Sequence, residues 1–309
     1  MKRTAYGTTD SAHRTVAVVG GGAIGCVMAS QAKIAGHNVT LCARTAFDRL
    51  LVEENGVESE TRVPIVTQPH EITAVDWVLL ATKAQDTKGA APWLERLVGP
   101  GTTVVALQNG IDHEERLQGV APAARAAILP ALVYVAAERI APGRIVHRNG
   151  RRIIVPQNDA GERFRSLLAD STLDVQLDAD FPRAAWRKLL SNLAANPLTT
   201  LTLRRLDALK DPDMAHLAEQ LLTEAVTVAR AAGVHLDSRD VRATLDLYGR
   251  FREDGGTSML YDRLAGRPLE HEHITGAVVR MAERHGVDVP LNRTILTLLR
   301  ALNGAGQSA

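Results

Sequence analysis

Short apolar runs alternate with amphipathic stretches through the first half of the chain. From Thr15 onward the runs are continuous, rich in β-branched residues and bounded by Gly, Pro or Asp, which is typical of strands buried on both faces. The clearest runs are Thr15–Val19, Asn38–Cys42, Trp77–Ala81 and Thr102–Leu107. Because helical segments separate them, right-handed crossovers are expected, and the pattern predicts a mostly parallel sheet covered by helices.

Further strand candidates extend this sheet, and helices then replace strands. The additional candidates are Ala127–Val135, Arg144–His147 and Arg152–Val155, and antiparallel pairing is expected among them. After about Phe181 the strand signal fades and apolar residues recur at helical spacing. The predicted helices include Met214–Ala232, Ser238–Arg252, Leu269–His285 and Asn292–Leu302.

The pattern divides the chain into three parts. Residues 1–14 are polar, lack periodicity and are expected to form a loose extension. Residues 15–180 are predicted to form an α/β domain, and residues 181–309 an all-α domain. A length of 309 residues is sufficient for two domains, since single cores rarely grow beyond about 250–300 residues.

Composition and charge exclude several classes of protein. Lys plus Arg total 36 against 35 for Asp plus Glu, so no broad basic surface for nucleic acid or membrane is expected, although a local basic pocket is compatible with this balance. The longest apolar run, Ile128–Ala137, is too short to span a bilayer. No signal-peptide core is found, and a cytoplasmic location is expected. Cys26 and Cys42 lie in apolar stretches and are expected to be buried thiols.

A glycine-rich turn follows the first predicted strand. The strand leads directly into Gly20-Gly21-Gly22-Ala23-Ile24-Gly25 and then into a small-residue helix. In this context GxGxxG is typical of a Rossmann-type, doubly wound dinucleotide site. Gly20 permits the tight turn, Gly22 allows the backbone to approach a pyrophosphate, and Gly25 lets the helix pack closely on the sheet. Free N–H groups at Ala23 and Ile24 face the phosphate charge. A glycine-rich turn without a ligand is the alternative.

The end of the second predicted strand distinguishes NADPH from NADH. An NAD-dependent enzyme usually has an Asp or Glu here, about 20 residues beyond the glycines, which accepts from the ribose 2′-OH. In this chain Arg44 occupies the position, and the first acidic residue is Asp48. A guanidinium can bind a 2′-phosphate through two donors, so Arg44 predicts NADPH/NADP+ as the cofactor. The alternative is that Arg44 is a solvated loop residue.

Three further segments complete a family pattern. They are Leu79-Leu80-Ala81-Thr82-Lys83-Ala84, Leu107-Gln108-Asn109-Gly110, and Trp186–Asn192 continuing to Asn196-Pro197-Leu198-Thr199. With the glycine-rich turn and the segment from Ser258 to Glu270, they resemble the ordered motifs of ketopantoate reductases over about residues 15–305. The resemblance implies an N-terminal NADP-binding Rossmann domain, an all-α C-terminal domain, and catalysis in the cleft between them.

The resemblance also implies roles for individual residues. Lys188 is similar to the catalytic lysine of the family, and Glu270 is similar to its partner carboxylate. Lys83 and Asn109 match residues near the nicotinamide and its ribose. The polar groups that hold the substrate correspond to Asn109, Asn192, Asn196 and Ser258.

The chemistry of Lys188 agrees with such a role. Hydride delivery to a ketone leaves negative charge on its oxygen, and a lysine can supply both a proton and a cation there. Lys188, Asn192 and Asn196 fall at i, i+4 and i+8, along one helical face. Pro197 removes the hydrogen bond to the Leu193 carbonyl and is expected to bend or break the helix. The alternative is a solvated face that ends in an Asn-Pro stop.

Glu270 stands at the start of a predicted helix, in Leu269-Glu270-His271-Glu272-His273. Two roles are open for its carboxylate, namely holding Lys188 protonated and aimed, or accepting from a substrate hydroxyl; ordinary helix capping is the alternative. The two histidines splay apart on a helix, so no metal site is predicted. Lys83 and Asn109 follow apolar runs at strand C-termini, where ligands of α/β sheets collect. A simple turn at Asn109-Gly110 is the alternative there.

The leading hypothesis is NADPH-dependent reduction of a small 2-oxo acid, 2-dehydropantoate, to (R)-pantoate in pantothenate biosynthesis. Three positions depart from the family pattern and bear on the choice of substrate, namely Gln108, His271 and Thr275. The alternatives are reduction of another 2-oxo acid or an imine on the same scaffold, and a non-catalytic NADP-binding sensor. A homodimer is compatible with the sequence, whereas neither nucleic acid nor membrane is an expected partner.

Overall fold

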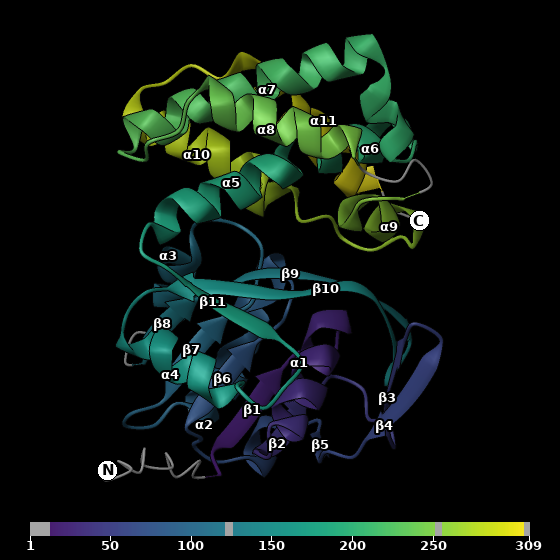
Figure 1. Ribbon diagram of the computed structural model, residues 1–309, viewed down its shortest axis with the longest axis vertical. Coiled ribbons are helices and arrows are strands. Elements are labelled where there is room, and N and C mark those ends of the chain that lie inside the picture. Colours follow the sequence, from purple (N-terminus) through teal and green to yellow (C-terminus); the bar gives the residue numbers. More distant parts are fainter. Residues whose placement is uncertain (1–12, 121–125, 251–254, 306–309) are drawn as a thin grey trace, which may run out of the picture.

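The computed structural model describes residues 13–120, 126–250 and 255–305 (Figure 1). Strands and their covering helices form the lower part in this view, and helices from Phe181 onward form the upper part. The predicted fold class, a Rossmann-type sheet followed by an all-α region, is confirmed. No helix of the described residues is long and apolar enough to cross a membrane.

A six-stranded parallel sheet carries the nucleotide-binding motif. Its strands are β1 (Thr15–Val19), β2 (Asn38–Cys42), β5 (Ile65–Val66), β6 (Trp77–Leu80), β7 (Thr103–Ala106) and β8 (Ala127–Pro130). The spatial order is β5-β2-β1-β6-β7-β8, so the order reverses at β1. Ligands of doubly wound sheets bind at such a reversal, beyond the carboxyl ends of the strands. The four clearest strand predictions are confirmed, two of them shortened by one residue at an end or at both.

A second, mixed sheet packs beside the first. It contains β3 (Leu50–Glu54), β4 (Val57–Thr61), β9 (Leu132–Ala141), β10 (Arg144–Pro156) and β11 (Asp174–Asp178). The single strand predicted over Ala127–Val135 is wrong, because it divides at Ala131 into β8 and β9, which join different sheets. The two strands predicted within β10 are one strand, whose pairing with β9 is irregular around Asn149. The hairpin β3–β4 was not predicted; its turn places Asn55 and Gly56 at φ 52° and 77°.

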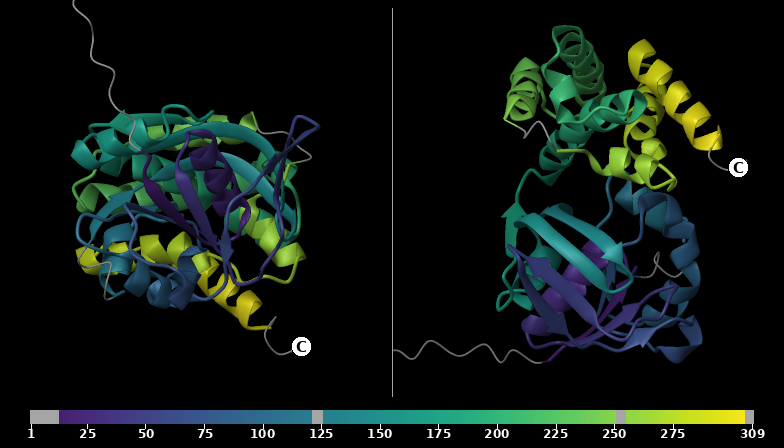
Figure 2. Two further views of the ribbon diagram at one scale, coloured as in Figure 1. Left: turned by 90° about the horizontal axis from the view of Figure 1, so that it is seen from below. Right: turned by 90° about the vertical axis from the view of Figure 1, so that its right-hand side faces the viewer.

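Short helices connect the strands of this half. They are α1 (Ala23–Ile34), α2 (Ala91–Leu97), α3 (His113–Gln118) and α4 (Asp159–Leu167), with 3₁₀ turns η1 (Pro69–Glu71) and η2 (Ala84–Ala90). Helix α1 shares one apolar core with strands of both sheets, so it lies between them (Figure 2). The prediction of two buried thiols is confirmed, since Cys26 and Cys42 are free and buried. Burial raises the pKa of both thiols to about 12.

Helices form the second half around a separate core. They are α5 (Phe181–Leu193), α6 (Ala195–Thr202), α7 (Pro212–Ala231), α8 (Ser238–Gly249), α9 (Ser258–Leu264), α10 (Thr275–His285) and α11 (Pro290–Ala305), with 3₁₀ turns η4 (Leu206–Lys210) and η5 (His271–His273). The helix predicted over Met214–Ala232 is confirmed as α7, and Asn292–Leu302 lies within α11. The helix predicted over Ser238–Arg252 is α8, with its last two predicted residues outside the described ranges. A continuous helix over Leu269–His285 is wrong, because η5 and an irregular residue, Ile274, precede α10.

The predicted helix break before Pro197 is confirmed. Helix α5 ends at Leu193 and α6 begins at Ala195, so the helix is interrupted where the proline cannot donate to the Leu193 carbonyl. The next residue, Leu198, donates its N–H to the Ala194 carbonyl at 3.1 Å. The break therefore falls between Asn192 of α5 and Asn196 of α6.

Candidate active site

The glycine-rich turn has the geometry that a dinucleotide diphosphate requires. Gly20 adopts φ +119°, and a Cβ there would lie 2.9 Å from the backbone of Ala81 and Thr82. A Cβ on Gly25 would lie 1.9 Å from the Gly20 carbonyl oxygen, so only glycine allows α1 to start so close to β1. Gly22 faces open space, and no side chain caps the N–H groups that begin at Ala23 and Ile24. The turn is therefore open to an anion at the helix N-terminus.

Arg44 lies two residues beyond β2, beside this turn. The backbone N–H of Gly20 donates to the Cys42 carbonyl at 2.9 Å, and Ala43 is the nearest neighbour of Gly21. Arg44 is exposed, and within the described ranges it makes no ion pair. Its guanidinium is thus free to meet a phosphate near the turn.

Four polar side chains from distant parts of the chain meet at the ends of β6 and β7. The Lys83 ammonium donates to Asp262 at 2.8 Å and to Glu270 at 3.1 Å. The Glu270 carboxylate also accepts from the side chain of Asn109 and from the backbone N–H of Ala84, both at 3.2 Å. Lys83 and Asn109 therefore lie together at strand C-termini, as the sequence predicted.

Lys83 and Glu270 each keep the other in its charged form. Burial by itself raises the pKa of Glu270, but the charge of Lys83 and the hydrogen bonds from Ala84, Lys83 and Asn109 bring it below its ordinary value. Burial lowers the pKa of Lys83, but the carboxylates of Glu270 and Asp262 more than compensate and raise it. Glu270 is therefore an ionised carboxylate at neutral pH, and Lys83 is an ammonium.

Asn196 and Ser258 are a second group that the structure brings together. The Asn196 side-chain oxygen accepts from the Met259 N–H at 3.2 Å and from the Ser258 hydroxyl at 3.4 Å, so it holds the first turn of α9. Asn196 is buried, whereas Ser258 is exposed. Asn192, one turn after Lys188 on α5, is half-buried, and its side chain makes no hydrogen bond with another described residue.

Lys188 extends from α5 to the second sheet. Its ammonium donates to the carbonyl of Val133 and lies 4.3 Å from the centre of the Tyr134 ring, both on β9. Burial and the nearby charge of Arg152 lower the pKa of Lys188 to about 8. Its charge also acts on His113 at the start of α3, whose pKa burial lowers to about 4. The amine thus lies where the helical half meets the sheets.

The structure does not join Lys188 directly to Glu270. The carboxylate is engaged by Lys83, Asn109 and Ala84, and no ion pair links it to Lys188 in the described part of the chain. Sequence reasoning overlooked Asp262, which completes the Lys83 cluster from α9. A signal for it existed, because Ser258 and Asp262 stand at i and i+4 and share one helical face.

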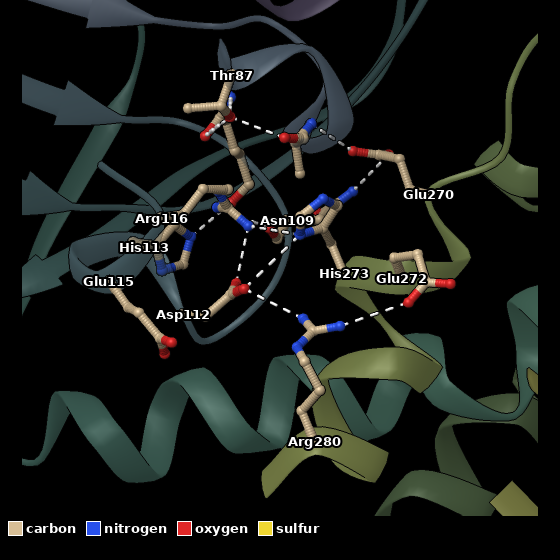
Figure 3. A network of polar contacts seen from close by, with 12 residues as sticks. Thr87, Asn109, Asp112, His113, Glu115, Arg116, Glu270, Glu272, His273 and Arg280 are labelled. Atoms are coloured by element: carbon tan, nitrogen blue, oxygen red, sulfur yellow. Dashed lines mark hydrogen bonds and ion pairs between the residues drawn. The ribbon is translucent and has the colours of Figure 1, made fainter. Parts of the chain in front are cut away.

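A partly buried charge network lies next to Asn109 and Glu270 (Figure 3). Arg116 on α3 donates to Asp112 at 2.8 Å, to the Asn109 carbonyl at 3.3 Å and contacts His273 at 3.1 Å. Arg280 on α10 reaches Asp112 at 3.3 Å. Burial raises the pKa of Asp112, but the hydrogen bond with His273 and the charges of Arg116 and Arg280 bring it well below its usual range. The network therefore ties α3 to the segment that carries Glu270.

The three positions that depart from the family pattern are all buried. Gln108 donates to Thr82 and Thr87, each at 2.9 Å, and so links the ends of β6 and β7. The His271 ring contacts the Leu269 carbonyl at 3.1 Å. The Thr275 hydroxyl is buried without a hydrogen-bond partner among the described residues. No group of three metal-ligating side chains occurs in the described ranges.

Comparisons with known proteins agree over nearly the whole chain. The family model "Ketopantoate reductase PanE/ApbA" matches residues 16–160, and "Ketopantoate reductase PanE/ApbA C terminal" matches residues 180–303. The 2-dehydropantoate 2-reductase of Caulobacter vibrioides is 37% identical over 93% of this chain and 98% of its own. That of Mycobacterium tuberculosis is 36% identical over 93% of this chain and 97% of its own.

Solved structures show the same similarity. A dimeric ketopantoate reductase from Staphylococcus aureus has a TM-score of 0.85 at 27% identity, covering 94% of this chain and 99% of that one. A PanE/ApbA family ketopantoate reductase from Ralstonia eutropha JMP134 has a TM-score of 0.87 at 26% identity, covering 95% and 99%. A D-mandelate dehydrogenase solved with NADH and anilino(oxo)acetate shares the fold, with a TM-score of 0.87 at 22% identity over 96% and 100%.

The network behind Asn109 generates a stability prediction. Replacing Arg116 by Met removes the cation that Asp112 and the Asn109 carbonyl share, and leaves a mostly buried carboxylate less compensated. The free energy of unfolding, measured in urea, is expected to fall by about 3 kcal/mol. Arg284→Met is the matched control, because its pair with Glu115 also joins α3 to α10 but is exposed. Equal losses in the two variants would contradict the buried network.

Proposed function

The chain belongs to the ketopantoate reductase family, and from this premise we propose that it reduces 2-dehydropantoate to (R)-pantoate with NADPH, a step of pantothenate biosynthesis. The family makes the protein an oxidoreductase that acts on a CH–OH group. One observation carries the mechanism: a lysine with a lowered pKa, Lys188, at the junction of the two halves.

The cofactor assignment rests on the turn and on Arg44. The open N-terminus of α1 suits a diphosphate, and the exposed guanidinium of Arg44 suits a 2′-phosphate. A bound nicotinamide would supply the hydride. Lys83 and Asn109, at the ends of β6 and β7, would bind near the nicotinamide ribose.

Lys188 acts as the general acid in this proposal. Negative charge develops on the substrate carbonyl oxygen as its carbon is reduced, and the ammonium both stabilises that charge and donates a proton. A pKa of about 8 suits proton donation near neutral pH, because the amine is still protonated but releases its proton readily.

Glu270, the side-chain amides of Asn192 and Asn196, and the Ser258 hydroxyl hold the substrate in this proposal. Since Glu270 is ionised, it accepts a hydrogen bond from a substrate hydroxyl and does not supply the proton. Glu270 and Lys188 then act together by contacting the same bound substrate and not each other. Asn192 and Ser258 have polar side-chain atoms that can bind the 2-oxo acid substrate. Asn196 fixes the position of Ser258 through a hydrogen bond.

A second candidate substrate is another 2-oxo acid or an imine. The departures at Gln108, His271 and Thr275 favour keeping it, since the buried Thr275 hydroxyl, which has no hydrogen-bond partner among the residues that the structure describes, lies shortly after Glu270. NADPH oxidation measured with a panel of 2-oxo acids and imines distinguishes the candidates. Activity with none of them would support the non-catalytic sensor instead.

We also expect a homodimer. The similar enzyme from Staphylococcus aureus is described as dimeric, at 27% identity over 94% of this chain. Light scattering of the purified protein would test the expectation.

The role of Lys188 can be tested by truncation. Lys188→Ala removes the proton donor, so kcat for NADPH-dependent reduction is expected to fall by about 10²–10⁴. NADPH affinity, measured by fluorescence, should change little because the glycine-rich turn is untouched. Lys33→Ala, an exposed lysine in the last turn of α1, is the control and should retain wild-type turnover. Near-normal kcat in Lys188→Ala would reject the assignment.

The pKa of Lys188 predicts opposite pH profiles for the two directions. Reduction requires the ammonium, so kcat should be constant below about pH 8 and decline above it. Oxidation of (R)-pantoate by NADP+ requires the neutral amine as base and should rise through the same pH. A reductive rate that stays constant to pH 10 would exclude Lys188 as the acid.

Cofactor preference should depend on Arg44. Loss of a charge-assisted hydrogen bond costs about 1.5–3 kcal/mol, so Arg44→Ala is expected to raise the Kd for NADPH by about tenfold to a hundredfold. The Kd for NADH, which lacks the 2′-phosphate, should remain the same. Arg49→Ala, an exposed arginine of the same loop, serves as the control. An equal loss for both cofactors would place Arg44 away from the 2′-phosphate.

A further inference from the structure

A cavity rich in arginine is lined in part by Tyr134, whose ring also contacts Lys188. It has a volume of about 710 Å³ and is formed by β9, β10, α5 and α8. Its lining residues are Tyr134, Arg152, Arg183, Arg187, Ser191, Arg239, Asp240, Ala243, Thr244 and Leu247. None of the residues assigned to cofactor, substrate or proton transfer lines it. The volume is in the range of small-molecule sites.

Positive charge predominates in this cavity. Four guanidinium groups face one lining carboxylate, that of Asp240. Asp240 accepts from Arg187 at 2.8 Å and lies 3.9 Å from Arg183. Arg239 is paired with Asp237, outside the lining, at 2.6 Å. The arginines therefore exceed the carboxylates that hold them.

Two of the arginines have guanidinium N–H donors that no described residue uses as an ion-pair or hydrogen-bond partner. The Nε of Arg183 is buried and has no hydrogen-bond partner in the described part of the chain. Arg152 makes no ion pair with any described residue and instead stacks on Tyr134, with its guanidinium carbon 4.3 Å from the ring centre. A buried guanidinium N–H without an acceptor is costly, and a planar guanidinium fixed by an aromatic ring is pre-organised for a bidentate acceptor.

We propose that this cavity binds a small dianion, of the phosphate, sulfate or dicarboxylate kind, through Arg152 and Arg183, and that its occupancy regulates the reductase through Tyr134 and Lys188. The regulatory part rests on the function proposed above, whereas binding itself does not. A dianion fits better than a monoanion because the four lining arginines have only two carboxylate partners, Asp240 and Asp237, which leaves an excess of two positive charges.

The Tyr134 ring connects the cavity to the amine. Arg152 and Lys188 each lie 4.3 Å from its centre, so one aromatic ring contacts both cations. The other charged or titratable groups near this pair are His113 of α3, Arg187 of α5 and Asp178 of β11. The positive charge of Arg152 lowers the pKa of the Lys188 amine. An anion that neutralises Arg152 therefore raises the pKa of Lys188 and keeps it protonated to higher pH.

Binding is measured first and without reference to activity. Sulfate, which remains a dianion across the relevant pH range, is titrated into the protein by calorimetry, with succinate as the dicarboxylate probe and chloride at equal ionic strength as the background. Wild-type protein should give saturable heat with a dianion and none with chloride. In Arg152→Gln and Arg183→Gln the affinity should fall by about tenfold or more. Arg230→Gln, an exposed arginine on α7, should bind as the wild type does.

Arg44→Ala separates this cavity from the expected 2′-phosphate site. Retained sulfate binding in Arg44→Ala, with loss in Arg152→Gln, supports the proposal. The reverse pattern, or no saturable binding of either dianion to folded wild-type protein, overturns it. Melting temperatures of each variant identify any that fail to fold, in which case Arg152→Lys, which keeps the charge but loses the bidentate fork, replaces Arg152→Gln.

The regulatory part is read from pH profiles. Sulfate should move the alkaline decline of kcat to higher pH in the wild type. Arg152→Gln should show the decline already displaced upward, and sulfate should no longer move it. Binding without any displacement of the wild-type profile would overturn the regulatory link while leaving the binding site intact.

Discussion

The Lys83 ammonium links the two parts of the candidate site, the strand ends of the sheet and the helical segment from α9 to η5. Lys83 donates to Asp262 and Glu270, which lie 179 and 187 residues away in the sequence. Both carboxylates are nearly inaccessible to solvent, with side chains about 5% exposed, and a buried carboxylate is strongly unfavourable without a cation. The end of β6 must therefore stay against α9 and the segment before η5. The constraint also keeps Asn109, whose side chain donates to Glu270, beside the helical half.

The sequence pattern predicted the parallel sheet because its strands are buried on both faces, so that each one is a continuous apolar run. The same criterion failed for β3 and β4, which contain four glutamates and bury only Leu50, Val52 and Thr61, so that neither strand is a continuous apolar run. The Asn55-Gly56 pair was the available signal, since it suits the positive φ of a hairpin turn. The division of Ala127–Val135 between two sheets left no mark in hydrophobicity, because Pro130 and Ala131 are as apolar as their neighbours.

The candidate site contains both positions that sequence periodicity predicts and contacts that it does not. Positions at strand ends, and the α5 face that carries Lys188 and Asn192, follow from periodicity and could be predicted. Glu270 was expected beside Lys188, but its partner in this structure is Lys83, and nothing in a one-dimensional pattern selects between two lysines. Arg116 and Tyr134 were missed for the same reason, since each acts through contacts between distant segments, whereas Asp262 shares a helical face with Ser258 and could have been included.

The two buried thiols have a consequence for chemical reactivity. Cys26 follows the glycine-rich turn in α1, and Cys42 ends β2 where its carbonyl receives the Gly20 N–H. With a pKa of about 12, each side chain is almost entirely a thiol at neutral pH and is unreactive toward alkylating or oxidising reagents while it is covered. Modification then requires the nucleotide-binding half to open locally. The rate at which the two thiols are alkylated therefore reports the free energy of that local unfolding.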